Sequence, residues 1–208
     1  IDNNLPEPNR IEEGNVLMMG IGGTGVVTIN QLLATAALLD GKESHGLDQT
    51  GLAQKGGPVV SNLKIRWAGA EGEVEEANKI GSGEADAYIV FDLLTGTSAV
   101  NLEKAMPGKT IALVSSSKVP TGAMVRDTSA KYPEWSTLQA TIDSATVPEK
   151  NIYFDAGRLS DALFRSHMPA NIIVLGSAYQ SGVIPISASA IEKAIELNGV
   201  SIDNNTQA

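Results

Sequence analysis

The most constraining feature of this chain is a cluster of four glycines between two apolar segments. Residues 15–19 form a short apolar run, which predicts a buried strand. Residues 24–39 form a longer one, which predicts a helix covered on more than one side. Between them the turn reads Gly20-Ile-Gly22-Gly23-Thr24-Gly25. Glycines permit a tight turn, and the helix start that follows it presents free N–H groups to an anion.

Further along, predicted strands alternate with predicted helices. Strands are expected at 44–48, 59–67, 87–92, 109–115, 123–127 and 151–156. Helices are expected at 95–105, 134–145, 158–165 and 170–180, and a last helix is capped by Ser187 or Ser189. Residues 59–67 alternate as in a half-exposed antiparallel strand near a sheet edge. The pattern predicts a Rossmann-like three-layer α/β domain with a largely parallel sheet and an antiparallel edge strand.

The sequence divides into three expected parts. Residues 1–14 are polar and form a leader or linker segment, residues 15–199 form the domain, and residues 200–208 form a trailing linker. The first fourteen residues lack the apolar centre of a signal peptide. Because the chain starts at Ile1 rather than Met, we expect a processed protein or an excised piece of a longer one.

Composition excludes several functions. With 15 basic and 24 acidic residues, the net charge of −9 argues against nucleic acid and anionic membranes as partners. The absence of cysteine excludes iron–sulfur ligation and thiol chemistry, and two histidines are too few for a three-histidine zinc site. We find no catalytic acid–base pair and no metal site. We interpret the neighbourhoods of Asp86 and Asp92 and of Asp155 and Arg158 as strand ends and helix starts, and we expect a cytoplasmic protein.

A second glycine-rich stretch, residues 49–58, lies between the predicted strands 44–48 and 59–67. In open α/β sheets, ligands bind at the carboxyl ends of strands. A lysine among glycines can meet a phosphate or carboxylate as a point charge. A flexible surface connection explains the same stretch equally well. The candidate binding residues here are Thr50, Gln54, Lys55, Gly56 and Gly57; those of the first turn are Gly20, Gly22, Gly23, Thr24 and Gly25.

Dinucleotide binding requires more than the first glycine turn. It calls for an acidic residue at the end of the second strand, about 20 residues on, to bind the ribose. Asp40 lies in the turn that ends the first helix, and Asp48 adjoins the second glycine-rich stretch, so neither fits the position cleanly. The turn could instead only pack helix on strand, or face another protein domain. A nucleotide-binding module and a scaffold domain therefore stay open.

Five segments resemble one family, the gamma-type domain of 2-oxoacid:ferredoxin oxidoreductases, and most of all its indolepyruvate branch. They read GIGGTGVVTINQLLATAALLDGK, TGLAQKGGPVVSNLKI, GEADAYIVFD, NIIVLGSAYQSGVIPIS and AIEKAIELNGVSIDNN. Together they extend from about residue 15 to residue 205, and residues 118–148 are the least similar part. The separate gamma subunits of pyruvate enzymes have Arg-Gly-Gly where this chain has Lys55-Gly56-Gly57.

The resemblance implies an oxidative decarboxylation. A 2-oxoacid and coenzyme A yield an acyl-CoA and CO₂, and the electrons pass to ferredoxin. It implies thiamine diphosphate with magnesium, and iron–sulfur clusters, in partner domains, and no cofactor held by this domain alone. This domain would cover the active site and help to bind coenzyme A, and it would be inactive in isolation.

Overall fold

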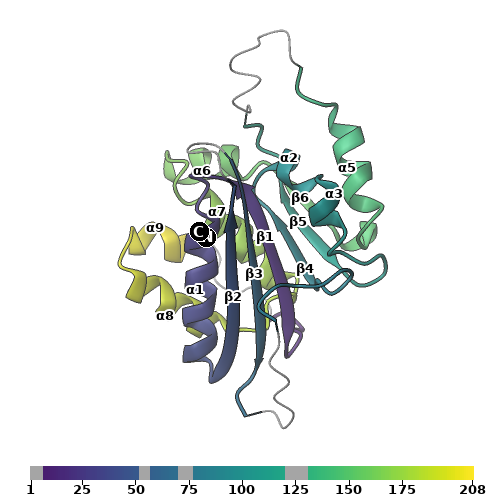
Figure 1. Ribbon diagram of the computed structural model, residues 1–208. Helices are drawn as coiled ribbons and strands as arrows, with labels where there is room; N and C mark the ends of the chain where they lie inside the picture. Colours follow the sequence, from purple (N-terminus) through teal and green to yellow (C-terminus); the bar gives the residue numbers. More distant parts are fainter. Residues whose placement is uncertain (1–6, 52–56, 70–76, 120–130) are drawn as a thin grey trace.

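The computed structural model describes residues 7–51, 57–69, 77–119 and 131–208 (Figure 1). Three of the candidate binding residues, Gln54, Lys55 and Gly56, lie outside these ranges. So does the short strand predicted at 123–127.

The described residues form a six-stranded sheet in the order β2-β3-β1-β4-β5-β6. Strands β1, β4, β5 and β6 are parallel, and β3 pairs antiparallel with both β1 and β2. The predicted α/β class, with a largely parallel sheet and antiparallel pairing at one edge, is confirmed. The strands are β1 (Gly14–Ile21), β2 (Lys42–Thr50), β3 (Pro58–Trp67), β4 (Ala87–Val90), β5 (Ile111–Ser115) and β6 (Ile152–Phe154).

Strand β3 differs from its prediction in one respect. It is antiparallel as expected, but β2 forms the edge of the sheet and β3 lies one position inside it. Its side chains are buried on both faces, Leu63 and Ile65 under α1 (Val26–Leu39) and Asn62 beneath the segment at Ile80. The side-chain amide of Asn62 satisfies the backbone N–H of Ile80 at 3.1 Å. The alternating polar residues of β3 suggested a face exposed to solvent, but other segments of the chain cover that face.

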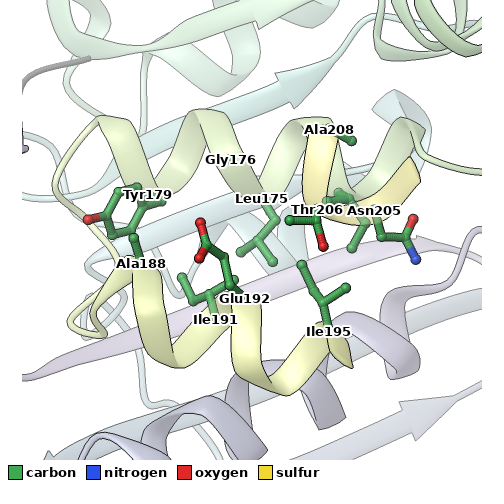
Figure 2. Close-up of a pocket in the computed structure, with 11 residues that line it drawn as sticks. Leu175, Gly176, Tyr179, Ala188, Ile191, Glu192, Ile195, Asn205, Thr206 and Ala208 are labelled. Carbon is green, nitrogen blue, oxygen red and sulfur yellow. The ribbon is translucent and has the colours of Figure 1, made fainter. Parts of the chain in front are cut away.

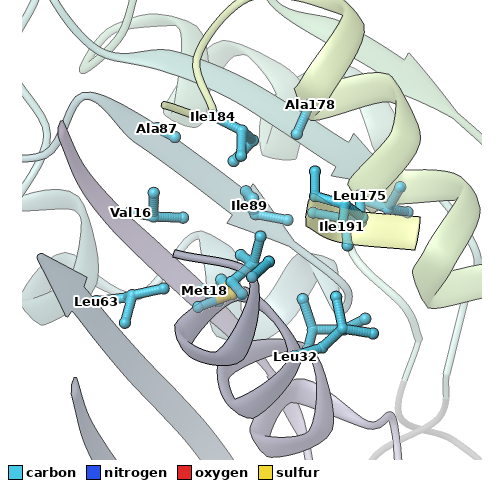
Figure 3. Packing of buried hydrophobic residues seen from close by; sticks show 14 of the residues in the cluster. Val16, Met18, Leu32, Leu63, Ala87, Ile89, Leu175, Ala178, Ile184 and Ile191 are labelled. Carbon is cyan, nitrogen blue, oxygen red and sulfur yellow. The ribbon is translucent and has the colours of Figure 1, made fainter. Parts of the chain in front are cut away.

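One face of the sheet packs against α1, α7 (Ala170–Gln180) and α8 (Ala188–Asn198). Side chains from β1, β3 and β4 meet these helices in a continuous apolar cluster (Figure 3). Helix α6 (Ala156–Phe164) joins this layer beside α7. The predicted helix at 158–165 begins two residues earlier because Asp155 caps it, its carboxylate accepting from the Arg158 N–H at 3.0 Å.

The opposite face packs against α2 (Leu93–Gly96), α3 (Ala99–Leu102) and α5 (Trp135–Asp143). The single helix predicted at 95–105 is broken into α2 and α3. The buried Tyr88 hydroxyl donates to the Gly96 carbonyl at 2.7 Å, so this carbonyl is drawn toward the sheet rather than along a helix. A Cβ at Gly96 would lie 2.5 Å from Val90, which explains the glycine.

The last residues fold rather than trail off as a polar tail. Residues Ile202–Gln207 form α9, which packs on α8. Helix α8 is capped by Ser187, whose hydroxyl accepts from the Ala190 N–H, and not by Ser189. The boundaries placed at 14/15 and 199/200 stay predictions. Among the described residues, no helix combines the length and apolar composition that a membrane crossing requires.

Candidate functional site

The first glycine turn is closed by its own hydrogen bonds. The backbone N–H and the hydroxyl of Thr24 both donate to the Ile21 carbonyl, at 3.1 and 2.7 Å. The Gly22 N–H donates to the Gly57 carbonyl at 2.8 Å, which ties the turn to the start of β3. Gly22 and Gly23 are nevertheless exposed on their outer side. The turn is therefore fixed in position and open to a ligand or a partner.

Two of these glycines are required by their surroundings. Gly25 has a φ of 78°, and a Cβ there would lie 2.4 Å from the side-chain nitrogen of Asn171 on α7. Gly20 is buried, and a Cβ there would lie 2.6 Å from the Thr24 hydroxyl and 3.2 Å from Phe91. The glycines thus allow the turn to lie directly against α7 and the end of β4.

The turn leads straight into α1 without a side-chain cap. Gly25 is the N-cap, and its carbonyl accepts from the Ile29 N–H at 3.0 Å. The first turn of α1 carries no acidic residue, and no side chain of the described residues caps it. Free N–H groups and the positive end of the helix dipole face the same side as Gly22 and Gly23 and would favour an anion there.

The second glycine-rich stretch, residues 49–58, is described at its two ends, and its C-terminal end contacts the first turn. Thr50, at the end of β2, is exposed and pairs with Val59. The Gly51 N–H donates to the Pro58 carbonyl at 2.9 Å, and Gly57 accepts from Gly22 as described above. The two glycine-rich stretches are therefore in contact through Gly22 and Gly57, while Thr50 lies on β2, on the far side of β3.

The direction of the strands explains this contact. Strands β1 and β2 both run antiparallel to β3, so β1 and β2 point the same way and finish at the same end of the sheet. The parallel strands β4, β5 and β6 finish at that end as well (Figure 1). We use the name glycine face for the carboxyl end of the sheet that carries the Gly20–Gly25 turn and the flanks Thr50 and Gly57.

A polar cluster at the ends of β5 and β6 was missed by the sequence interpretation. The Ser117 hydroxyl donates to the Asp155 carboxylate at 2.5 Å and accepts from the Gly157 N–H at 2.9 Å. Hydrogen bonds from the Arg158 N–H and from Ser117 hold the pKa of Asp155 below its usual range. Asp92, at the end of β4, caps α2 through the Thr95 N–H at 2.9 Å. Both aspartates are the helix starts that the sequence predicted, and Ser117, distant in sequence, gave no local signal.

Asn171 is a second residue that the sequence did not indicate. It lies in the first turn of α7 and reaches Gly25 of the first turn. The histidines lie apart from this contact: His45 is exposed on β2, and His167 is exposed with Nε2 3.1 Å from Asp161. Within the described ranges, no three histidine or acidic side chains gather as metal ligands would.

A hollow in the described structure lies elsewhere, between α7, α8 and α9 (Figure 2). Its walls are mainly apolar, with Leu175, Ile191 and Ile195 facing one another, and Tyr179 lies at its rim. Its volume of about 120 Å³ is below the roughly 300–1,000 Å³ of small-molecule sites. It is too small for a nucleotide, so the glycine face remains the candidate binding site.

Known proteins resemble this chain over nearly its whole length. Indolepyruvate oxidoreductase subunit IorB of Archaeoglobus fulgidus is 26% identical over 181 residues, which cover 87% of this chain and 83% of that protein. Residues 15–208 match the family described as pyruvate ferredoxin/flavodoxin oxidoreductase. That match continues through α9 to the last residue.

Solved structures share the fold. Pyruvate oxidoreductase subunit PORC of Thermotoga maritima aligns with a TM-score of 0.63 and 20% identity, over 95% of this chain and 93% of that one. The gamma subunit of a keto/oxoacid ferredoxin oxidoreductase from Geobacter sulfurreducens aligns with a TM-score of 0.60 and 18% identity, over 93% and 92%.

A longer protein contains the same fold as a part. The 2-oxoglutarate:ferredoxin oxidoreductase of Magnetococcus marinus, solved with 2-oxoglutarate, coenzyme A and succinyl-CoA bound, aligns with a TM-score of 0.64 and 14% identity. The alignment covers 95% of this chain and 30% of that one. With the family match over residues 15–208, these comparisons establish that the chain belongs to the pyruvate ferredoxin/flavodoxin oxidoreductase family.

Proposed function

We propose that this chain is the gamma-type subunit or domain of an indolepyruvate:ferredoxin oxidoreductase, and that its glycine face helps to bind coenzyme A. The assembled enzyme would convert a 2-oxoacid and coenzyme A to acyl-CoA and CO₂ and pass two electrons to ferredoxin. The resemblance to IorB supports the indolepyruvate branch. The comparisons do not favour a stand-alone nucleotide-binding module or a scaffold unrelated to this enzyme.

The redox chemistry belongs to partner domains. A chain without cysteine supplies no thiolate ligands for an iron–sulfur cluster. Thiamine diphosphate, magnesium and the clusters would therefore be held by partner domains of the same enzyme in the cytoplasm. We expect the isolated chain to show no turnover with indolepyruvate, coenzyme A, thiamine diphosphate and a viologen acceptor. Turnover by the pure chain would contradict this division of roles.

The observation that carries the coenzyme A role is the contact between Gly22 and Gly57. It joins an uncapped helix start to the loop that contains Lys55, on a chain whose net charge is −9. Coenzyme A carries phosphates, which bind at helix N-termini and to lysine. The 2-oxoglutarate enzyme with this fold was solved with coenzyme A bound. A face that only docks a neighbouring domain by shape is the competing explanation.

Steady-state kinetics of the assembled enzyme separate these explanations. Lys55→Ala should raise the KM for coenzyme A about ten- to a hundredfold, as expected from about 1.5–3 kcal/mol for a hydrogen bond to a charged group. The KM for the 2-oxoacid and the assembly of the subunits should not change. Lys193→Ala is the matched control, because Lys193 is exposed on α8 and pairs with Glu196. Unchanged coenzyme A kinetics in Lys55→Ala would rule out the phosphate contact and leave the docking role.

A further inference from the structure

A hydrogen-bonded cluster of Asn30, Asp48 and Ser61 connects α1 to the hairpin that β2 and β3 form. The side-chain nitrogen of Asn30, on α1, donates to the carboxylate of Asp48 on β2 at 2.8 Å. The hydroxyl of Ser61, on β3, donates to the same carboxylate oxygen. One oxygen atom of Asp48 therefore holds three elements together.

The location of this cluster relates it to the site. Helix α1 begins at the first glycine turn, and β2 and β3 lead into and out of the second loop. Asn30 lies in the second turn of α1, and Asp48 lies near the carboxyl end of β2, where it is paired with Ser61. On β2 the neighbouring position facing α1 is Gly46, where a Cβ would lie 3.5 Å from the Asn30 nitrogen. The helix thus lies close to the strand at the level of the cluster.

Asp48 is exposed, whereas the two side chains that donate to it are buried. Asn30 is 5% exposed and Ser61 is fully buried. The carbonyl oxygen of the Asn30 side chain is buried and has no hydrogen-bond partner among the described residues. A buried acceptor without a partner destabilises a fold, and an apolar side chain of similar shape avoids that cost. The amide of Asn30 therefore carries a cost at its oxygen, and its nitrogen makes the hydrogen bond that connects α1 to β2.

We propose that Asn30, Asp48 and Ser61 act as positioning residues, which hold the first glycine turn and the flanks Thr50 and Gly57 in the relative arrangement that binds coenzyme A. The inference rests on the proposed function for its ligand, while its structural part can be tested separately. None of the three residues needs to touch coenzyme A. Their effect passes through α1 and the hairpin to the Gly22–Gly57 hydrogen bond.

Asn30→Leu and Asp48→Ala test the inference in the assembled enzyme. Asn30→Leu removes the unpartnered acceptor, so its melting temperature should stay equal to wild type or rise. Both variants should raise the KM for coenzyme A about two- to tenfold, the range for loss of a typical hydrogen bond, with kcat unchanged. Asp48→Asn, which keeps an acceptor oxygen, should restore the KM. Gly46→Ala is the control beside the cluster, because its Cβ would make ordinary contacts and leave the hydrogen bonds intact.

Amide hydrogen exchange provides the readout that does not depend on the ligand. Exchange at the Gly22 N–H should accelerate in Asp48→Ala and Asn30→Leu, while exchange in β4 stays unchanged. Unaltered exchange at Gly22 would overturn the positioning role and leave the coenzyme A proposal intact. Faster exchange at Gly22 with an unchanged coenzyme A KM would also overturn it. An unchanged KM for coenzyme A in Lys55→Ala would instead count against the coenzyme A contact of the proposed function.

Discussion

The ammonium nitrogen of Lys42 lies 4.4 Å from the centre of the Trp67 ring, directly across the β2–β3 pairing. Lys42 is 6% exposed, and its ammonium donates to the carbonyls of Glu12 and Pro185. Burial lowers its pKa from the usual value. This buried cation joins the segment before β1, the start of β2 and the segment before α8.

Replacing Lys42 should therefore destabilise the protein. Lys42→Met keeps the apolar stem but leaves the Glu12 and Pro185 carbonyls without this donor. We expect a loss of about 1–3 kcal/mol in the free energy of unfolding, the cost of unsatisfied buried groups. Urea denaturation measures it. Lys193→Met, on the exposed face of α8, should change stability by less than about 0.5 kcal/mol. Equal effects of the two substitutions would contradict the role of Lys42.

The lowered pKa of Asp155 predicts that its contribution to stability depends on pH. Its pKa is lower in the folded protein, so the folded state favours the carboxylate. The contribution is complete above the unfolded-state pKa of about 3.9 and is lost as the pH falls through the folded value. Asp155→Ala should cost about 1 kcal/mol at pH 7, as for loss of an N-cap, and the difference from wild type should narrow below pH 4.

Asp155→Asn is the informative comparison. Asparagine caps helices about as well as aspartate, so stability at pH 7 should stay close to wild type. Because the amide does not titrate, this variant should lack the part of the acid dependence that Asp155 contributes. Thermal unfolding between pH 3 and pH 7 distinguishes the variants. A constant difference between Asp155→Ala and wild type over that range would refute the pKa assignment.

The two positive-φ glycines of the first turn should respond differently to alanine. At Gly23, with a φ of 98°, an added Cβ meets nothing within 4 Å, so the cost is backbone strain of about 1–2 kcal/mol. At Gly25 the same strain is joined by a contact of 2.4 Å with Asn171. We expect Gly25→Ala to lower the melting temperature more than Gly23→Ala and to disturb the first turn of α7. Equal melting temperatures of the two variants would show that the Asn171 side chain moves away from the added Cβ without loss of stability.

The glycine turn should not confer tight binding of NAD or NADP. In dinucleotide-binding domains the strand beside β1 runs parallel to it and ends in an acidic residue. Here β3 occupies that position and runs the opposite way, and Asp48 lies one strand further out and is engaged by Asn30 and Ser61. Calorimetric titration should give no micromolar affinity for either cofactor. Micromolar binding would revive the nucleotide-module hypothesis.

The sequence predicted the features that depend on neighbouring residues. The strand–turn–helix unit at Gly20 follows from glycines between two apolar runs, and the Asp155 cap follows from an acidic residue before a helix. The position of β3 between β1 and β2 could not be predicted, because it depends on pairing between distant segments. The break at Gly96 is of the same kind, since it depends on the hydroxyl of Tyr88 in the sheet.

The candidate site shows the same division. The residues of the first turn and the flanks Thr50 and Gly57 were proposed from the glycine-rich pattern, and their role in binding stays a prediction. Asn171 was missed because its partner Gly25 lies far away in the sequence. Asp48 was considered only as a ribose ligand, since its partners Asn30 and Ser61 become neighbours only when α1 lies on the hairpin.

The β2–β3 hairpin also has a consequence for the order of folding. Residues 42–67 pair within one short stretch of chain, whereas β1, β4, β5 and β6 are joined by long crossovers. Loop closure is less costly for local pairing, so the hairpin can form before the parallel strands are in place. The hairpin is nevertheless bound to the rest of the fold, because β3 pairs with β1 along its length and Leu63 and Ile65 belong to the main core. The flanks Thr50 and Gly57 thus belong to a part of the chain that pairs locally, and the first glycine turn joins them only when β1 pairs with β3.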